Sequence, residues 1–127
     1  MDADAAGLLH RDISRRVIGA FFETYNELGH GFLEGVYEAA LAVRLEECGL
    51  AFERQVPIEV RFHGRIVGCF RADLLVENRV LVEIKAGGSL LAAHEAQLLN
   101  YLKATGIQLG LLLNFGPRAE FRRRVFS

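Results

Sequence analysis

Three segments of the chain repeat apolar residues at intervals of three and four, the spacing that gathers side chains on one face of an α-helix. These segments predict helices over residues 13–28, 33–48 and 89–105. Asp12 or Ser14 is expected to cap the first helix, and Ser89 the third. A glycine commonly ends a helix, and one follows each segment: Gly29, Gly49 and Gly106.

Three other segments alternate apolar and polar residues, as a β-strand with one buried face does. They predict strands over residues 53–62, 70–76 and 80–86. The residues expected to face inward are Val56, Ile58, Val60 and Phe62 in the first strand, Phe70, Ala72, Leu74 and Val76 in the second, and Val80, Val82, Ile84 and Ala86 in the third. His63 and Gly64 predict a hairpin turn between the first two strands, so we expect an antiparallel meander.

The C-terminal part adds one further strand. Residues 109–113 are all apolar, which is typical of a central strand beside a helix-covered sheet. Residues 118–127 fit a short helix, an edge strand or a mobile segment, and the sequence leaves these alternatives open. The order of helix, three strands, helix and strand predicts an α/β (α+β) fold, with an αβββαβ core and a mixed central sheet flanked by helices.

Three charged residues stand out on the polar sides of the second and third strands: Asp73, Glu83 and Lys85. If both apolar faces reach one core, a three-residue loop over 77–79 pairs Val76 with Val80 and places Asp73 opposite Glu83. Like charges at that spacing are destabilising. A divalent cation between the carboxylates would remove the repulsion, and Lys85 on the same face would steady a developing anion. A solvated sheet face with incidental ion pairs remains the alternative.

Composition limits the class of protein. A chain of 127 residues has the length of one domain, which we expect over residues 1–127 with its core at about 13–115. The residues are 51% hydrophobic, but no apolar run is long enough to span a bilayer. The first ten residues lack the pattern of a secretion signal, and two cysteines are too few for a disulfide framework, so a cytoplasmic location is expected. The 15 Lys and Arg against 16 Asp and Glu argue against binding nucleic acid by overall charge.

Two helices carry further candidate residues. Glu34 begins the second predicted helix, where the helix dipole alone favours an acid. On the third helix, Gln97 and Tyr101 are four residues apart and share a face. Taken alone, each of these is also compatible with ordinary surface polarity.

The order of elements, with acids on the second and third strands, resembles the core of the PD-(D/E)XK nuclease superfamily, the restriction-endonuclease-like fold. Gly31-Phe-Leu-Glu34-Gly-Val-Tyr37 resembles the motif of the GxxExxY proteins, a family of small bacterial proteins in that superfamily. Gln97-Leu-Leu-Asn-Tyr101 is similar to the Q-x-x-x-Y motif of RecB-type nucleases. The residue before Asp73 is Ala72, where the superfamily's name has proline.

The resemblance implies a metal-dependent nuclease that hydrolyses DNA phosphodiester bonds by a metal-activated water. Asp73, Glu83 and Glu34 would bind Mg²⁺ or Mn²⁺, and Lys85 would assist the attacking water. Gln97 and Tyr101 would hold the substrate backbone or the geometry of the site. The implied partner is nucleic acid, DNA in preference to RNA, and no membrane partner is expected.

Two alternatives to this function stay open. One is a junction-resolving endonuclease of the same class, which would cut branched duplexes in preference to linear ones. The other is a catalytically inactive protein that keeps the fold for nucleic-acid binding or for oligomeric interaction, because a fold does not guarantee chemistry. A homodimer is compatible with either alternative, and no sequence feature fixes the oligomeric state.

Overall fold

The computed structural model describes residues 9–127; the start of the chain, in which no secretion signal was recognised, lies largely outside the described residues. The elements along the chain are α1 (Arg11–Leu28), α2 (Glu34–Glu47), β1 (Phe52–Phe62), β2 (Arg65–Val76), β3 (Val80–Lys85), α3 (Ala92–Thr105), β4 (Leu109–Phe115) and β5 (Ala119–Val125). The predicted order of elements is confirmed, and the undecided tail is resolved as strand β5. None of the described helices combines the length and the apolar character needed to cross a membrane.

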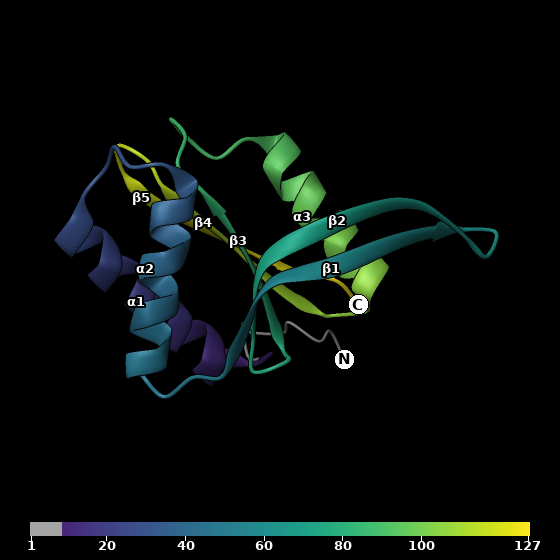
Figure 1. Ribbon diagram of the computed structural model, residues 1–127, viewed down its shortest axis with the longest axis horizontal. Helices are drawn as coiled ribbons and strands as arrows, with labels where there is room; N and C mark the ends of the chain where they lie inside the picture. Colours follow the sequence, from purple (N-terminus) through teal and green to yellow (C-terminus); the bar gives the residue numbers. More distant parts are fainter. Residues whose placement is uncertain (1–8) are drawn as a thin grey trace.

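The strands form one mixed sheet with the order β1-β2-β3-β4-β5. The first three strands pair antiparallel, as the meander predicted. Helix α3 then carries the chain back so that β4 pairs parallel with β3, and β5 returns antiparallel along β4. The resulting α/β architecture has helices on both faces of the sheet (Figure 1).

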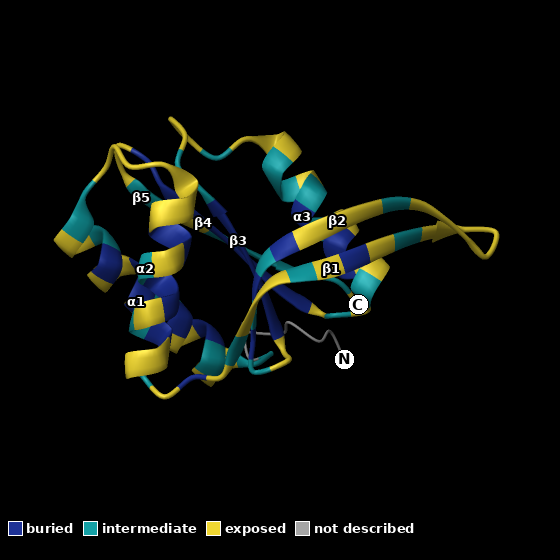
Figure 2. Cartoon of the chain, in the orientation of Figure 1, coloured by how far each residue is buried: buried dark blue, intermediate teal, exposed yellow. Residues whose placement is uncertain are grey.

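The two faces of the sheet have separate cores. Helices α1 and α2 cover one face, where Phe115 packs between Phe21 and Tyr37, with ring centroids 4.8 Å and 4.4 Å away respectively. Helix α3 covers part of the other face and contributes Leu98 and Leu102 to the second core. Strands β3 and β4 lie between these layers and are almost entirely buried, which explains their nearly continuous apolar sequences (Figure 2).

The β1–β2 hairpin extends beyond the helices as an arm (Figure 1). Its turn is the predicted one, because His63 and Gly64 both have positive φ and Phe62 pairs with Arg65. The prediction that Phe62 faces inward is wrong: its side chain is 64% exposed. No helix reaches this part of the arm, whose outer half is mostly exposed (Figure 2), so alternation along β1 does not translate into burial there.

The sheet changes its buried face within β2. Leu74 and Val76 pack toward α1 and α2, but Ala72 belongs to the core under α3 and the ring of Phe70 contacts Tyr101. The prediction that these four residues share one face is therefore wrong. The switch falls at Asp73, and it coincides with a positive φ of 53° at Gln55 on the neighbouring strand.

Helix starts also differ from the predictions. Helix α1 begins at Arg11, so Asp12 and Ser14 lie inside its first turn and do not precede it. Helix α3 begins after Leu91, not at Ser89, and the His94 Nδ1 atom accepts a hydrogen bond from the Leu91 backbone N–H at 3.1 Å. The predicted C-terminal glycines are confirmed for α1 and α3.

The loops that follow β3 and β4 are fastened together. The Asn114 side chain accepts a hydrogen bond from the Gly87 N–H at 3.1 Å and donates one to the Gly87 carbonyl at 3.4 Å. A Cβ atom at Gly116 would overlap that carbonyl oxygen. This close approach fixes the end of β3, the strand that carries Glu83 and Lys85.

We therefore expect Gly116→Ala to lower the free energy of unfolding by about 1–3 kcal/mol, the usual cost of overpacking. The matched control is Gly35→Ala on α2, where a new Cβ meets nothing within 4 Å. Urea denaturation of both variants measures the difference. Equal stabilities of the two variants would contradict the close contact between the loops.

Candidate active site

Two carboxylates lie where strand β2 separates from β3. The pairing between the two strands ends at Leu74 and Val82. Asp73 and Glu83 are the next residue on each strand, on the side where the pairing has stopped. Beyond that point Asp73 Oδ2 accepts a hydrogen bond from the Ile84 N–H at 2.7 Å, and the Asp73 N–H donates to Glu83 Oε2 at 3.4 Å. Side chains thus take the place of backbone partners in the opening. The predicted juxtaposition of Asp73 and Glu83 is confirmed.

Glu83 is held in an environment that disfavours its charge. Its side chain is buried, and only 5% of the residue is exposed. Burial raises its pKa to about 9, assisted by the hydrogen bond to Asp73 and by that residue's charge, while Lys85 acts in the opposite direction. At neutral pH and without a cation, Glu83 therefore retains a proton. A cation bound to the pair would displace this proton, because it would replace the repulsion by attraction.

Lys85, Gln97 and Tyr101 lie beside the carboxylates. Lys85 follows Glu83 on the same side of β3, and its Nζ atom donates a hydrogen bond to Gln97 Oε1 at 3.5 Å. Tyr101 is buried one turn further along α3, and burial raises the pKa of its hydroxyl, with additional contributions from Glu83 and Asp73. These contacts and charge effects place five of the six candidate residues in one region.

Glu34 makes no described contact with this region. It is the exposed first residue of α2, and residues 9–127 contain no group of three or more His, Cys, Asp or Glu side chains arranged to share a metal ion. The tyrosine of its motif is structural: the Tyr37 hydroxyl donates to the Gly29 carbonyl at 2.5 Å and accepts from the Phe32 N–H at 3.2 Å. Tyr37 thereby holds the loop between the first two helices against the core.

The helix acid that does approach the pair is Glu38, one turn after Glu34. It is 7% exposed, forms an ion pair with Arg54 and accepts a hydrogen bond from Gln55, whose amide also contacts Asp73. No sequence motif assigns a function to Glu38. The available signal was its place on the apolar stripe of the helix, next to Tyr37, where an acid needs a buried partner.

The donor set fits a hard divalent cation. The oxygen atoms of Asp73 and Glu83 are adjacent, one carboxyl is desolvated, and Mg²⁺ typically takes one or two carboxylates while water or substrate phosphate fills its other positions. Lys85 supplies a positive charge in the same region. Asp73 and Glu83 are therefore the residues that would hold Mg²⁺ or Mn²⁺.

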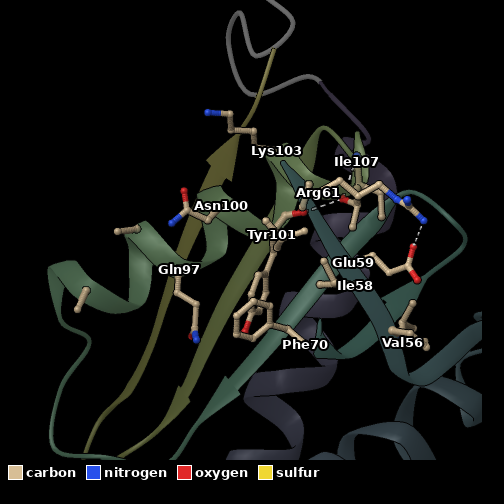
Figure 3. A pocket seen from close by; sticks show the side chains of 16 residues that line it. Val56, Ile58, Glu59, Arg61, Phe70, Gln97, Asn100, Tyr101, Lys103 and Ile107 are labelled. Carbon is tan, nitrogen blue, oxygen red and sulfur yellow. Dashed lines mark hydrogen bonds and ion pairs between the residues drawn. The ribbon is translucent and has the colours of Figure 1, made fainter. Parts of the chain in front are cut away.

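A groove runs between the hairpin arm and α3 (Figure 3). Its volume is about 1290 Å³, and Gln97 and Tyr101 belong both to its wall and to the candidate site. Phe70 projects into it with 47% of its surface exposed, its ring centroid 5.6 Å from that of Tyr101. The cationic side chains among the described lining residues are Arg61, which pairs with Glu59, and Lys103. The groove is therefore mainly apolar and aromatic.

The fold, with a mixed five-stranded sheet, helices on both faces and a pair of acids at a strand opening, has the organisation of a restriction-endonuclease-like core. The family description of the PD-(D/E)XK nuclease superfamily matches residues 11–125. The chain belongs to this superfamily.

A solved structure supports the fold assignment. The chain is similar to the crystal structure of SSO0001, with 22% sequence identity and a TM-score of 0.54, over 72% of this chain and 48% of the other. It spans about half the length of that protein, and at this identity the similarity shows a shared fold alone. Comparison with curated protein sequences gave no significant match.

The raised pKa of Glu83 predicts how stability depends on pH. Between the ordinary value of 4.5 and about 9, the folded protein holds a proton that the unfolded chain has lost. Stability of the metal-free protein should therefore fall as pH rises through this window. The isosteric variant Glu83→Gln lacks this loss, and we expect it to be more stable than the wild type by about 1–3 kcal/mol at pH 8.

Urea denaturation in the presence of a chelator, at several pH values between 5 and 8.5, measures this effect. Glu59→Gln is the matched control, because Glu59 is an exposed acid on the arm. If wild type and Glu83→Gln lose stability with the same slope, burial of an ionisable pair is not the governing feature of the site.

Proposed function

We propose that this protein is a nuclease that hydrolyses phosphodiester bonds with a divalent cation, Mg²⁺ or Mn²⁺, held by Asp73 and Glu83. DNA is the proposed substrate. The observation that carries the proposal is the carboxylate pair at the opening between β2 and β3, in which Glu83 is buried, with Lys85 on the same strand as Glu83. Within the superfamily, Gly31, Glu34 and Tyr37 support placing the chain among the GxxExxY proteins.

Phosphodiester hydrolysis requires charge neutralisation and a positioned nucleophile, and each residue of the proposed site has a role in one of these. A bound cation would neutralise the phosphate and make water a better nucleophile at neutral pH. The carboxylate of Asp73 is held in place by the Ile84 N–H, so it presents a fixed ligand. Lys85, steadied by Gln97, is positioned to donate to charge that develops on the phosphate oxygens. Glu34 is not included in this proposal, because its side chain is exposed and makes no described contact with Asp73 or Glu83.

The groove supports an unpaired strand as the form of DNA that approaches the site. A duplex is bound mainly through its phosphates, which calls for a lining rich in Lys and Arg. Here the lining is mostly apolar, and an exposed Phe70 stands beside Tyr101. Aromatic rings of this kind stack on bases of single strands without regard to sequence. We propose that a base of the substrate stacks on Phe70.

Removing the proposed ligand or the lysine tests the chemistry. We expect Asp73→Ala and Lys85→Ala each to reduce the rate of DNA cleavage by roughly 100-fold or more, because stabilisation of transition-state charge depends on them. The measurement is cleavage of labelled single-stranded, duplex and branched DNA with Mg²⁺ or Mn²⁺. Glu46→Gln, at the exposed far end of α2, is the control that should cleave as the wild type does.

Activity that survives both substitutions would reject the assigned site. Faster cleavage of branched duplexes than of single strands would favour the junction-resolving alternative. If the wild type neither binds a divalent cation nor cuts any of these substrates, the non-enzymatic alternative is favoured.

Binding can be tested apart from cleavage. With a labelled oligothymidine and no divalent cation, Phe70→Ala should bind about tenfold more weakly than the wild type, since one stacked base contributes about 1–3 kcal/mol. Phe62→Ala removes an exposed aromatic ring from the same arm but outside the groove, and it should bind normally. Equal affinities of the two variants would place the strand elsewhere.

A further inference from the structure

Gln55 has a backbone conformation that a strand does not require. Its φ of 53° lies in the left-handed region, which non-glycine residues rarely adopt and which carries a cost in free energy. Gln55 is not in a turn: its neighbours Arg54 and Val56 both pair with β2, with Leu74 and Ala72 respectively. Such strain inside a strand persists only when the surrounding structure holds it, and it is a reason to look for a local function.

The kink brings two successive side chains to the same partner. Neighbouring residues of a regular strand point to opposite faces, yet Arg54 and Gln55 both contact Glu38. Arg54 Nε donates to Glu38 Oε2 at 3.1 Å, and Arg54 Nη2 forms an ion pair with the same oxygen at 3.0 Å. Gln55 Nε2 donates to Glu38 Oε1 at 2.7 Å. Both oxygen atoms of this buried carboxylate are therefore engaged, and Glu38 is a fixed acceptor on α2.

The same amide continues to the candidate active site. Gln55 Nε2 lies 3.4 Å from Asp73 Oδ1, while the other oxygen of Asp73 accepts the Ile84 N–H. The Asp73 carboxylate is thus held from two sides, by β1 and by β3. The kinked backbone is itself secured, because Arg71 donates to the Gln55 carbonyl at 3.3 Å. These contacts form a continuous link from α2 through β1 to the acid on β2.

We propose that Gln55 is a positioning residue, whose strained backbone aims its amide so that Glu38 and Asp73 are joined and the Asp73 carboxylate is fixed for cation binding. This inference rests on the proposed function. Hydrogen bonds of this kind orient metal ligands, and their loss typically lowers metal affinity about 10- to 100-fold. The rival explanation is that the kink serves only to turn the arm toward α3.

Two variants separate these explanations. Gln55→Gly keeps the backbone conformation without strain but removes the amide, whereas Gln55→Met keeps the length and the strain and also removes the amide. If the amide positions Asp73, both variants should bind Mn²⁺ about tenfold more weakly in calorimetric titrations. The denaturant midpoint of Gln55→Gly should stay near that of the wild type, since relief of strain offsets the lost hydrogen bonds.

A second readout does not depend on metal. In the metal-free protein, the Ile84 amide proton is protected by Asp73, so freeing that carboxylate should speed its hydrogen exchange about tenfold in both variants. The internal control is Val82, which lies on β3 as Ile84 does and pairs with Leu74 of β2. Its amide should exchange as in the wild type.

The outcomes are distinct. Weaker Mn²⁺ binding and faster Ile84 exchange in both variants, with Val82 unchanged, support the positioning role. Unchanged Mn²⁺ affinity and unchanged Ile84 exchange in either variant overturn it and leave the kink as an architectural feature. If the wild type binds no Mn²⁺, the proposed function fails, and Ile84 exchange alone then decides whether Gln55 holds Asp73.

Discussion

The separation of β2 from β3 at Asp73 is the constraint on which the rest of the site depends. Two strands that stayed paired would satisfy their backbone groups with each other and leave no room between them. Here Asp73 and Glu83 supply the missing partners, and two acids come together, of which Glu83 is buried and Asp73 half-buried. Desolvation of Glu83 and repulsion from Asp73 disfavour a second negative charge in the pair, and the pKa of Glu83 is raised as a result. A bound cation would supply the positive charge that allows both carboxylates to ionise.

The opening lies where the two hydrophobic cores contact different parts of the same strands. The end of β2 that leads to β3 packs under α1 and α2. The part that precedes Asp73 packs under α3, and it comes from the hairpin arm. The change of face coincides with the positive φ of Gln55 in β1. Tyr101 lines the groove beside α3, and Glu83 and Asp73 contribute to the raised pKa of its hydroxyl, so the substrate path that we propose adjoins the acid pair.

Much of this could be predicted from the sequence, because the relevant patterns are local. Periodicity gave the elements, and the loop after Val76 gave the register that pairs Val76 with Val80. What escaped prediction depends on contacts between distant segments. The face switch at Asp73 brings Ala72 under α3, and Phe62 is exposed because no helix covers it. The link through Glu38 and Gln55 is made of contacts between residues 16 to 18 positions apart. The motif drew attention to Glu34, but burial identifies Glu38, one turn later, as the helix acid linked to the site.

The central claim is that Asp73 and Glu83 share one divalent cation, and diffraction from crystals soaked in Mn²⁺ tests it most directly. An anomalous peak is expected between the two carboxylates, at about 2.0–2.3 Å from an oxygen atom of each. A peak elsewhere, or none at Mn²⁺ concentrations that saturate binding in solution, would contradict it.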